Sequence, residues 1–266
     1  MSWRSVPAIG GGGGGGGGYD PNEWAQRNSM LYLPVGANQT GQTVLACSVD
    51  NFGNLTAQTV NPAAGTLFES LKRLGHRTNT GVNNRSACFA TAGPQYFRGN
   101  AAGLGGFRAV LRWGVSQQNA GDMRIMCGMT SGTSVPAGSV EPSANTNCFF
   151  VGADSTDTQL QLMHNDAAGA CTKVALGVGM PWLGVANVDL YQVVLTCAVG
   201  VVTEMSYTVT RLDTGTEVSG TINSNLPTVN VLLKPTYWIS NGPTNAAQTT
   251  IDELGWYVDD QNGVVP

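Results

Sequence analysis

Hydrophobic and polar residues alternate along the second half of the chain, from Gly103 onward. Around Trp113, apolar residues occupy every second position, whereas Arg108 and Arg112 occupy positions between them. A period of two is typical of a β-strand, whose successive side chains point to opposite faces. We expect strands at 107–115, 123–129, 148–151, 160–162, 189–199, 205–210, 217–222, 237–240 and 250–258.

Turn-forming residues separate these segments and indicate the fold class. Gly, Asn, Asp and Pro lie between the predicted strands, and residues 213–216 (Asp-Thr-Gly-Thr) predict a tight hairpin turn. About ten short strands joined by Gly-rich loops predict an all-β protein, an antiparallel β-sandwich or jelly roll. No exact internal repeat is present, which argues against a propeller or a solenoid. We expect the core to contain Trp113, Leu162, Leu195, Val209, Ile239 and Trp256.

The first hundred residues carry a weaker pattern. Consecutive glycines at 10–18 cannot form a stable helix or an isolated strand, because glycine loses the most backbone entropy on ordering. Short strands are expected at 30–35 and 44–49, with a turn at 51–54. The apolar spacing over 67–74 predicts a short helix, with an irregular strand as the alternative.

These patterns divide the chain into three parts. Residues 1–40 form an extended Gly-rich arm, 41–103 a small β-rich connecting region, and 104–266 the jelly-roll domain. The glycines resemble a flexible linker in composition.

Charged residues are scarce, at 11% of the chain against roughly 25% in a typical soluble domain. The surface must then be largely Thr, Ser, Asn and Gln, which suits packing against other subunits; a secreted β-protein with neutral loops is the alternative. A net charge of −4 and a pI near 5.1 argue against a nucleic-acid surface. No apolar run reaches the roughly 18 residues of a membrane span, and the N-terminus lacks a signal peptide's apolar core. We therefore expect synthesis in a cytoplasm and no membrane insertion.

The cysteines are spread widely, and none forms a CxxC pair, which argues against zinc-finger and redox motifs. Cys127 and Cys197 alternate with apolar residues on the predicted core faces of their strands, where a free thiol behaves as a small hydrophobe. An even number leaves disulfides open, but we expect buried thiols. The six are Cys47, Cys88, Cys127, Cys148, Cys171 and Cys197.

Several phrases in the second half resemble a concanavalin A-like jelly roll, in the variety found at the C-terminal ends of bacteriophage tail-fibre and appendage proteins. They are Asp-Leu-Tyr-Gln-Val at 189–193, Ser-Tyr-Thr-Val-Thr-Arg at 206–211, Asp-Thr-Gly at 213–215, Ile-Asp-Glu-Leu-Gly-Trp-Tyr at 251–257, and the Gly-rich phrase at 97–107. The resemblance implies a virion structural protein, made in the host bacterial cytoplasm and commonly a homotrimer. Legume-type lectins share the sandwich, but their metal and sugar ligands find no residue-by-residue match here.

The resemblance also gives the arm a role, which is to dock the chain onto other virion proteins. Aromatic residues flank the glycines, and such side chains suit an interface because they combine a large apolar ring with a polar tip. The expected virion-anchoring residues are Trp3, Gly10, Gly14, Gly18, Tyr19 and Trp24.

Catalytic chemistry finds little support in the histidines. A Ser-His-Asp triad would need His76 or His164, yet neither lies near a Gly-x-Ser-x-Gly elbow. We expect His164 to lie at a strand end, and His76, close to Arg73 and Arg77, to lie at a surface or subunit contact.

Paired carboxylates are the residues that glycan cleavage needs, because two acidic groups flank the scissile bond. Asp154 and Asp157 lie in a turn composition where Asp caps the backbone, although calcium is an alternative on ligand type. We expect no enzyme, no metal and no cofactor. The other acidic candidates are Asp166, Asp252 with Glu253, and Asp259 with Asp260.

Two aromatic residues are candidates for stacking on a sugar ring. Trp182 follows a Gly-Met-Pro loop phrase, and Trp238 faces away from Tyr237 and Ile239 on its strand. The alternative for each is a place in the core or in a subunit interface.

The leading hypothesis is a bacteriophage tail-fibre or appendage subunit, anchored by its arm and presenting the sandwich for assembly or host attachment. The second is a capsid decoration or head-fibre protein with the same fold. The third is a module that binds host surface glycans or, less expected, cleaves them.

Overall fold

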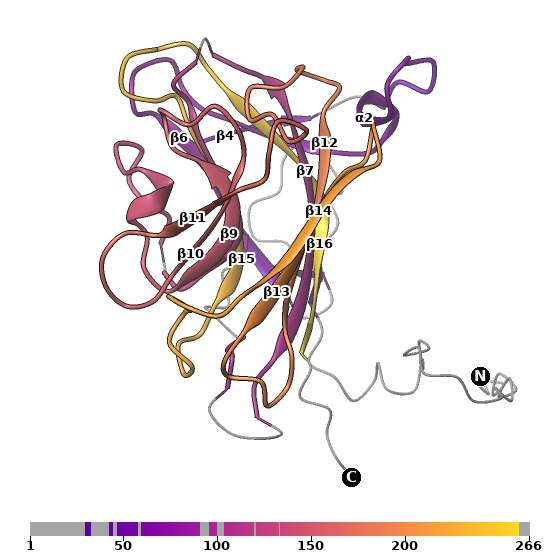
Figure 1. Cartoon of the computed structure of the whole chain (residues 1–266). Coiled ribbons are helices and arrows are strands. Elements are labelled where there is room, and N and C mark those ends of the chain that lie inside the picture. Colours follow the sequence, from indigo (N-terminus) through magenta and orange to yellow (C-terminus); the bar gives the residue numbers. More distant parts are fainter. Residues whose placement is uncertain are drawn as a thin grey trace, which may run out of the picture.

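Two antiparallel β-sheets pack face to face (Figure 1). The computed structural model describes residues 30–32, 43–44, 47–57, 60–90, 96–99, 104–119, 121–132 and 134–260. The only helical segments in this described part are the one-turn helix α2 (Leu67–Ser70) and the 3-10 turn η1 (Pro142–Ala144). The predicted all-β sandwich is confirmed.

The first sheet has the order β14-β13-β12-β7-β16-β5-β4, and β1 also pairs with β16. Its centre is β7, which pairs along its length with β12 on one side and with β16 on the other. Its strands are β1 (Met30–Tyr32), β4 (Asn54–Ala57), β5 (Leu74–Arg77), β7 (Phe107–Gln117), β12 (Leu190–Cys197), β13 (Met205–Arg211), β14 (Thr216–Ile222) and β16 (Thr250–Asp260).

The second sheet has the order β11-β10-β9-β8-β15-β6-β3-β2. Here β15 bridges β8 and β6, so a late segment of the chain joins two earlier ones. Its strands are β2 (Thr43–Val44), β3 (Cys47–Phe52), β6 (Arg85–Ala90), β8 (Arg124–Thr130), β9 (Cys148–Ala153), β10 (Gln161–Asn165), β11 (Thr172–Ala175) and β15 (Lys234–Ser240).

Gly53 alone separates β3 from β4, yet these strands belong to different sheets. Its φ is +94°, and a Cβ at this position would lie 2.5 Å from the hydroxyl of Ser86. Glycine adopts such a conformation without steric cost, so this residue turns the chain from the second sheet to the first. The turn predicted at 51–54 is confirmed.

The expected connecting region, 41–103, is corrected by this topology. It supplies β2, β3 and β6 to the second sheet and β4 and β5 to the first. These strands are short, and two of them pair with strands near the end of the sequence, β5 with β16 and β6 with β15. The sandwich therefore begins well before residue 104.

The helix expected over 67–74 is shorter than its pattern predicts. It ends at Ser70, because Leu74 begins β5 and points into the core. Thr66 caps its first turn by accepting a hydrogen bond from the backbone of Glu69 at 3.3 Å. No helix in the described ranges is long and apolar enough to cross a membrane.

The main core lies between the sheets and contains all six side chains that the sequence predicts for it: Trp113, Leu162, Leu195, Val209, Ile239 and Trp256. Free thiols are buried at Cys88, Cys127, Cys148 and Cys197 and half-buried at Cys171, largely as expected. The proposed anchoring residues of the arm, Trp3 to Trp24, lie outside the described residues.

Candidate functional site

A long segment between β8 and β9, described over residues 131–132 and 134–147, packs on the outer side of the second sheet; we call it the β8–β9 connection. Val135 of this segment joins a second hydrophobic cluster whose strand residues alternate with those of the main core, so they lie on the opposite face. The cluster contains Ala87, Phe89, Met126, Val135, Cys148, Phe150, Met163 and Trp238.

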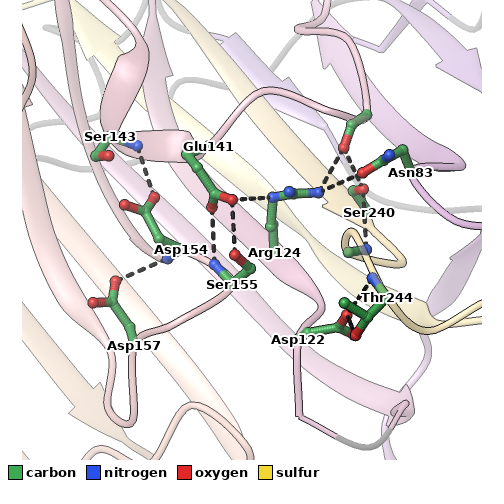
Figure 2. A network of polar contacts seen from close by, with 12 residues as sticks. Asn83, Asp122, Arg124, Glu141, Ser143, Asp154, Ser155, Asp157, Ser240 and Thr244 are labelled. Atoms are coloured by element: carbon green, nitrogen blue, oxygen red, sulfur yellow. Dashed lines mark hydrogen bonds and ion pairs between the residues drawn. The ribbon is translucent and has the colours of Figure 1, made fainter.

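A network of polar contacts around the buried Arg124 fixes the connection in place (Figure 2). The Nε of Arg124, on β8, lies 2.8 Å from Oε1 of Glu141 in the connection. The same guanidinium donates to the carbonyl of Gly138 at 2.9 Å and to the side chain of Asn83 at 3.0 Å. Glu141 also accepts the backbone N–H of Ser155 at 2.9 Å. Arg124 therefore links the connection to β8 and to the turn before β6, and Glu141 links it to the turn after β9.

Gly138 packs tightly against the turn before β6. A Cβ there would lie 1.8 Å from the carbonyl oxygen of Asn83, so any larger residue would push the connection off the sheet. Its carbonyl also accepts the hydroxyl of Ser240 at 2.7 Å.

Asp154 and Asp157, the calcium candidates, bind a lysine and the backbone. Asp154 accepts the N–H of Ser143 at 2.9 Å, and Asp157 accepts the N–H of Asp154 at 2.8 Å, as the turn composition predicts. The Lys173 ammonium lies 2.8 Å from a carboxylate oxygen of each. Burial lowers the pKa of Lys173, but its hydrogen bonds to both aspartates outweigh this and leave the pKa raised. A protein cation thus stands where the calcium alternative would place the ion.

A cavity of about 210 Å³ opens between the end of β8 and the connection. Its polar lining consists of Thr130, Ser131, Ser134, Asn145 and Thr146, and none of its lining residues is charged. Hydroxyl and amide groups both donate and accept hydrogen bonds. Such a lining is complementary to a neutral, hydroxyl-rich ligand rather than to an ion.

The two tryptophans proposed for sugar stacking are not exposed, which corrects that expectation. Trp182 is 3% exposed and packs in the main core. Trp238 faces away from the main core as predicted, but the β8–β9 connection covers it and its exposure is 0%. Neither ring offers a face to a sugar in this structure, and their alternative place in a core is the one found.

The two histidines differ in outcome. His164 lies near the end of β10 as expected, with Nδ1 3.0 Å from the carbonyl of Asn225. His76, expected at a surface or a subunit contact, is fully buried on β5, and its Nε2 lies 3.0 Å from Oε1 of Glu253. The sequence pattern does not predict this burial, because the alternation of inward-facing residues, Leu74 and His76, is too short to mark a strand.

The remaining acidic candidates whose side chains are described are buried on β16 or contact a turn. Asp252 and Glu253 are fully buried neighbours on β16, and Asp259 is 7% exposed. Asp166 accepts the backbone N–H of Ala168 at 2.9 Å, which is a turn contact.

No protein-family model matches the chain, and no curated protein matches it. Solved structures do match: peanut lectin with a bound peptide has a TM-score of 0.54 and 13% identity, covering 88% of this chain and 97% of the lectin. The lectin UEA-II in complex with galactose has a TM-score of 0.53 and 15% identity, covering 87% and 98%. A protein of unknown function from Shewanella oneidensis MR-1 has a TM-score of 0.54 and 10% identity, covering 93% and 96%.

The fold is that of the legume lectins. At these identities the similarity concerns the fold alone, so the concanavalin A-like sandwich expected from the sequence is confirmed.

Proposed function

We propose that this chain is a non-enzymatic structural subunit of a bacteriophage virion appendage, and that its sandwich binds a host-surface carbohydrate. The binding site is the cavity beside the β8–β9 connection. The observation that carries the proposal is this neutral, hydroxyl- and amide-lined cavity, held by buried contacts on a lectin fold.

The chemistry of the cavity favours a sugar over other ligands. A carbohydrate presents neutral hydroxyl groups, and each can both donate to and accept from Ser, Thr and Asn side chains. The Arg124–Glu141 pair anchors the connection to β8. Because the connection is held in this way, the cavity lining is preorganised and loses little conformational entropy on binding.

The virion role is supported by the resemblance of 189–257 to phage appendage proteins, whose expected fold is the one found. A second support is the outer face of the first sheet. There Arg112, Gln192, Thr210 and Glu217 lie in register across four strands, exposed or half-exposed. An open polar face of this kind suits packing against further copies, as in a homotrimer. A capsid decoration protein would use the same features at another place on the particle.

Two experiments test the two halves of this proposal. Glycan-array binding of the full-length chain is expected to show a defined set of sugars, and a silent array would contradict the carbohydrate half.

Electron microscopy of particles with this subunit labelled is expected to place it on a tail appendage. Its absence from particles, or a monomer by light scattering, would contradict the virion half.

A further inference from the structure

Three side chains with metal-ligating atoms meet in the main core, although they are far apart in the sequence. His76 lies on β5 and Glu253 on β16 of the first sheet, and Cys88 lies on β6 of the second. One ligand atom from each lies within 4.8 Å of the other two, and all three residues are fully buried.

Such a group is costly in an apolar core. A buried carboxylate loses its hydration, and the contact of Glu253 Oε1 with Nε2 of His76 at 3.0 Å restores part of it. The Nδ1 of His76 has no hydrogen-bond partner in the described part of the chain. Trp113 and Ile251, which lie opposite Glu253 and His76 on the neighbouring strands, are large apolar side chains of the main core. A divalent cation would offset this cost.

We propose that His76, Cys88 and Glu253 form a zinc site that joins the two sheets. Imidazole, thiolate and carboxylate are the ligands that zinc takes in proteins. Metal–ligand bonds of about 2.0–2.3 Å in a tetrahedron separate the ligand atoms by roughly 3.3–3.6 Å. The contact between His76 and Glu253 must therefore widen by a few tenths of an ångström, and rotation about the Cys88 side chain supplies the rest.

Binding has a defined proton balance. Zinc replaces the proton of the Cys88 thiol, which leaves as H⁺, while His76 binds as neutral imidazole and Glu253 as carboxylate. Ligands from three strands and both sheets make the site structural, occupied during folding.

The test uses the full-length chain produced in zinc-supplemented medium and purified without chelator. Elemental analysis is expected to find about one zinc per chain. Cys88→Ala is expected to lose the metal. Cys197→Ala is the matched control, because Cys197 is another fully buried thiol of the same core but contacts the carbonyl of Arg98, and it is expected to keep the metal.

A second measurement covers the case in which Cys88→Ala fails to fold. The wild-type chain is unfolded with a chelator and refolded with cobalt(II), which is expected to produce a near-ultraviolet thiolate-to-cobalt absorption band. Metal-free wild type that also refolds without this band, or equal metal content in Cys88→Ala and wild type, would overturn the proposal. The carbohydrate proposal stands apart from this outcome, because its cavity lies at the β8–β9 connection.

Discussion

The indole N–H of Trp238 donates a hydrogen bond to the carbonyl of Pro136 at 3.2 Å. This contact joins a strand residue of the second sheet to the β8–β9 connection, and the whole ring is buried beneath it. The outer face of this sheet is therefore a second small core, which supports one wall of the candidate cavity.

Replacing Trp238 is expected to destabilise the protein in proportion to the volume removed. Trp238→Ala should lower the free energy of unfolding by about 3–5 kcal/mol, and Trp238→Phe, which loses the hydrogen bond but keeps a ring, by about 1–3 kcal/mol. Urea unfolding followed by tryptophan fluorescence measures both. Equal midpoints for Trp238→Ala and wild type would mean that the connection does not cover this residue.

Glu141→Gln tests the contact that holds the connection. Arg124 is buried, so removing its charged partner should lower the free energy of unfolding by about 1–3 kcal/mol, less than for a fully buried pair because Glu141 is one-third exposed. The matched control is Glu217→Gln on exposed β14, which should change stability by under about 0.5 kcal/mol. If the two variants unfold at the same urea concentration, the Arg124–Glu141 pair contributes nothing to the attachment.

His164 is expected to make stability fall with acid. Burial lowers its pKa below the ordinary value of 6.5, although its hydrogen bond to the Asn225 carbonyl acts the other way. The unfolded chain therefore binds the proton first. Stability is full above pH 6.5 and declines as pH falls from there to the lowered pKa.

The comparison is between wild type and His164→Gln, with unfolding measured from pH 7.5 down to about 5. The variant should show a flatter stability curve over this range. Parallel curves would show that another group is responsible for any acid sensitivity.

Cys148 and Cys171 are expected to form a disulfide under oxidation. Their Sγ atoms lie 3.5 Å apart, and closing to a bond of about 2.05 Å requires only small side-chain rotations. Diamide, an azo oxidant, would take two electrons and two protons from the thiols. Mass spectrometry of the alkylated native protein should then find one linked peptide pair, with the fully buried Cys88 and Cys127 still reduced. Two alkylated thiols at 148 and 171 after this treatment would contradict the geometry.

The sequence predicts the strands whose alternation is long, and these include the centre of both sheets. Trp113 and Trp256 mark core faces because β7 and β16 each have 11 residues, enough for the period to be visible. Four-residue strands such as β5 have too few positions for this, so the nearby Arg73 and Arg77 point His76 to a surface or a subunit contact. Strand partners also escape prediction, since β7 contacts β12 and β16 far along the chain.

In the candidate site, too, local sequence predicts some features, whereas others depend on contacts between distant parts of the chain. The turn role of Asp154 and Asp157 follows from local composition, but Lys173 reaches them only because β11 folds back beside β10. The orientation of Trp238 was predictable from alternation, whereas its cover was not. The apolar residues of 131–147 are scattered and show no helical or strand period. The apolar pair Val135-Pro136 is the local sign that part of this segment packs inward.

The most direct measurement for the central claim is carbohydrate binding by two matched variants of the full-length chain. Thr146→Trp places a large ring in the candidate cavity from an exposed lining position, and Thr203→Trp makes the same exposed change in the loop before β13. With the sugars that wild type binds on the array, isothermal titration should show binding lost in Thr146→Trp and retained in Thr203→Trp. Equal binding by the two variants would contradict the assignment of the site.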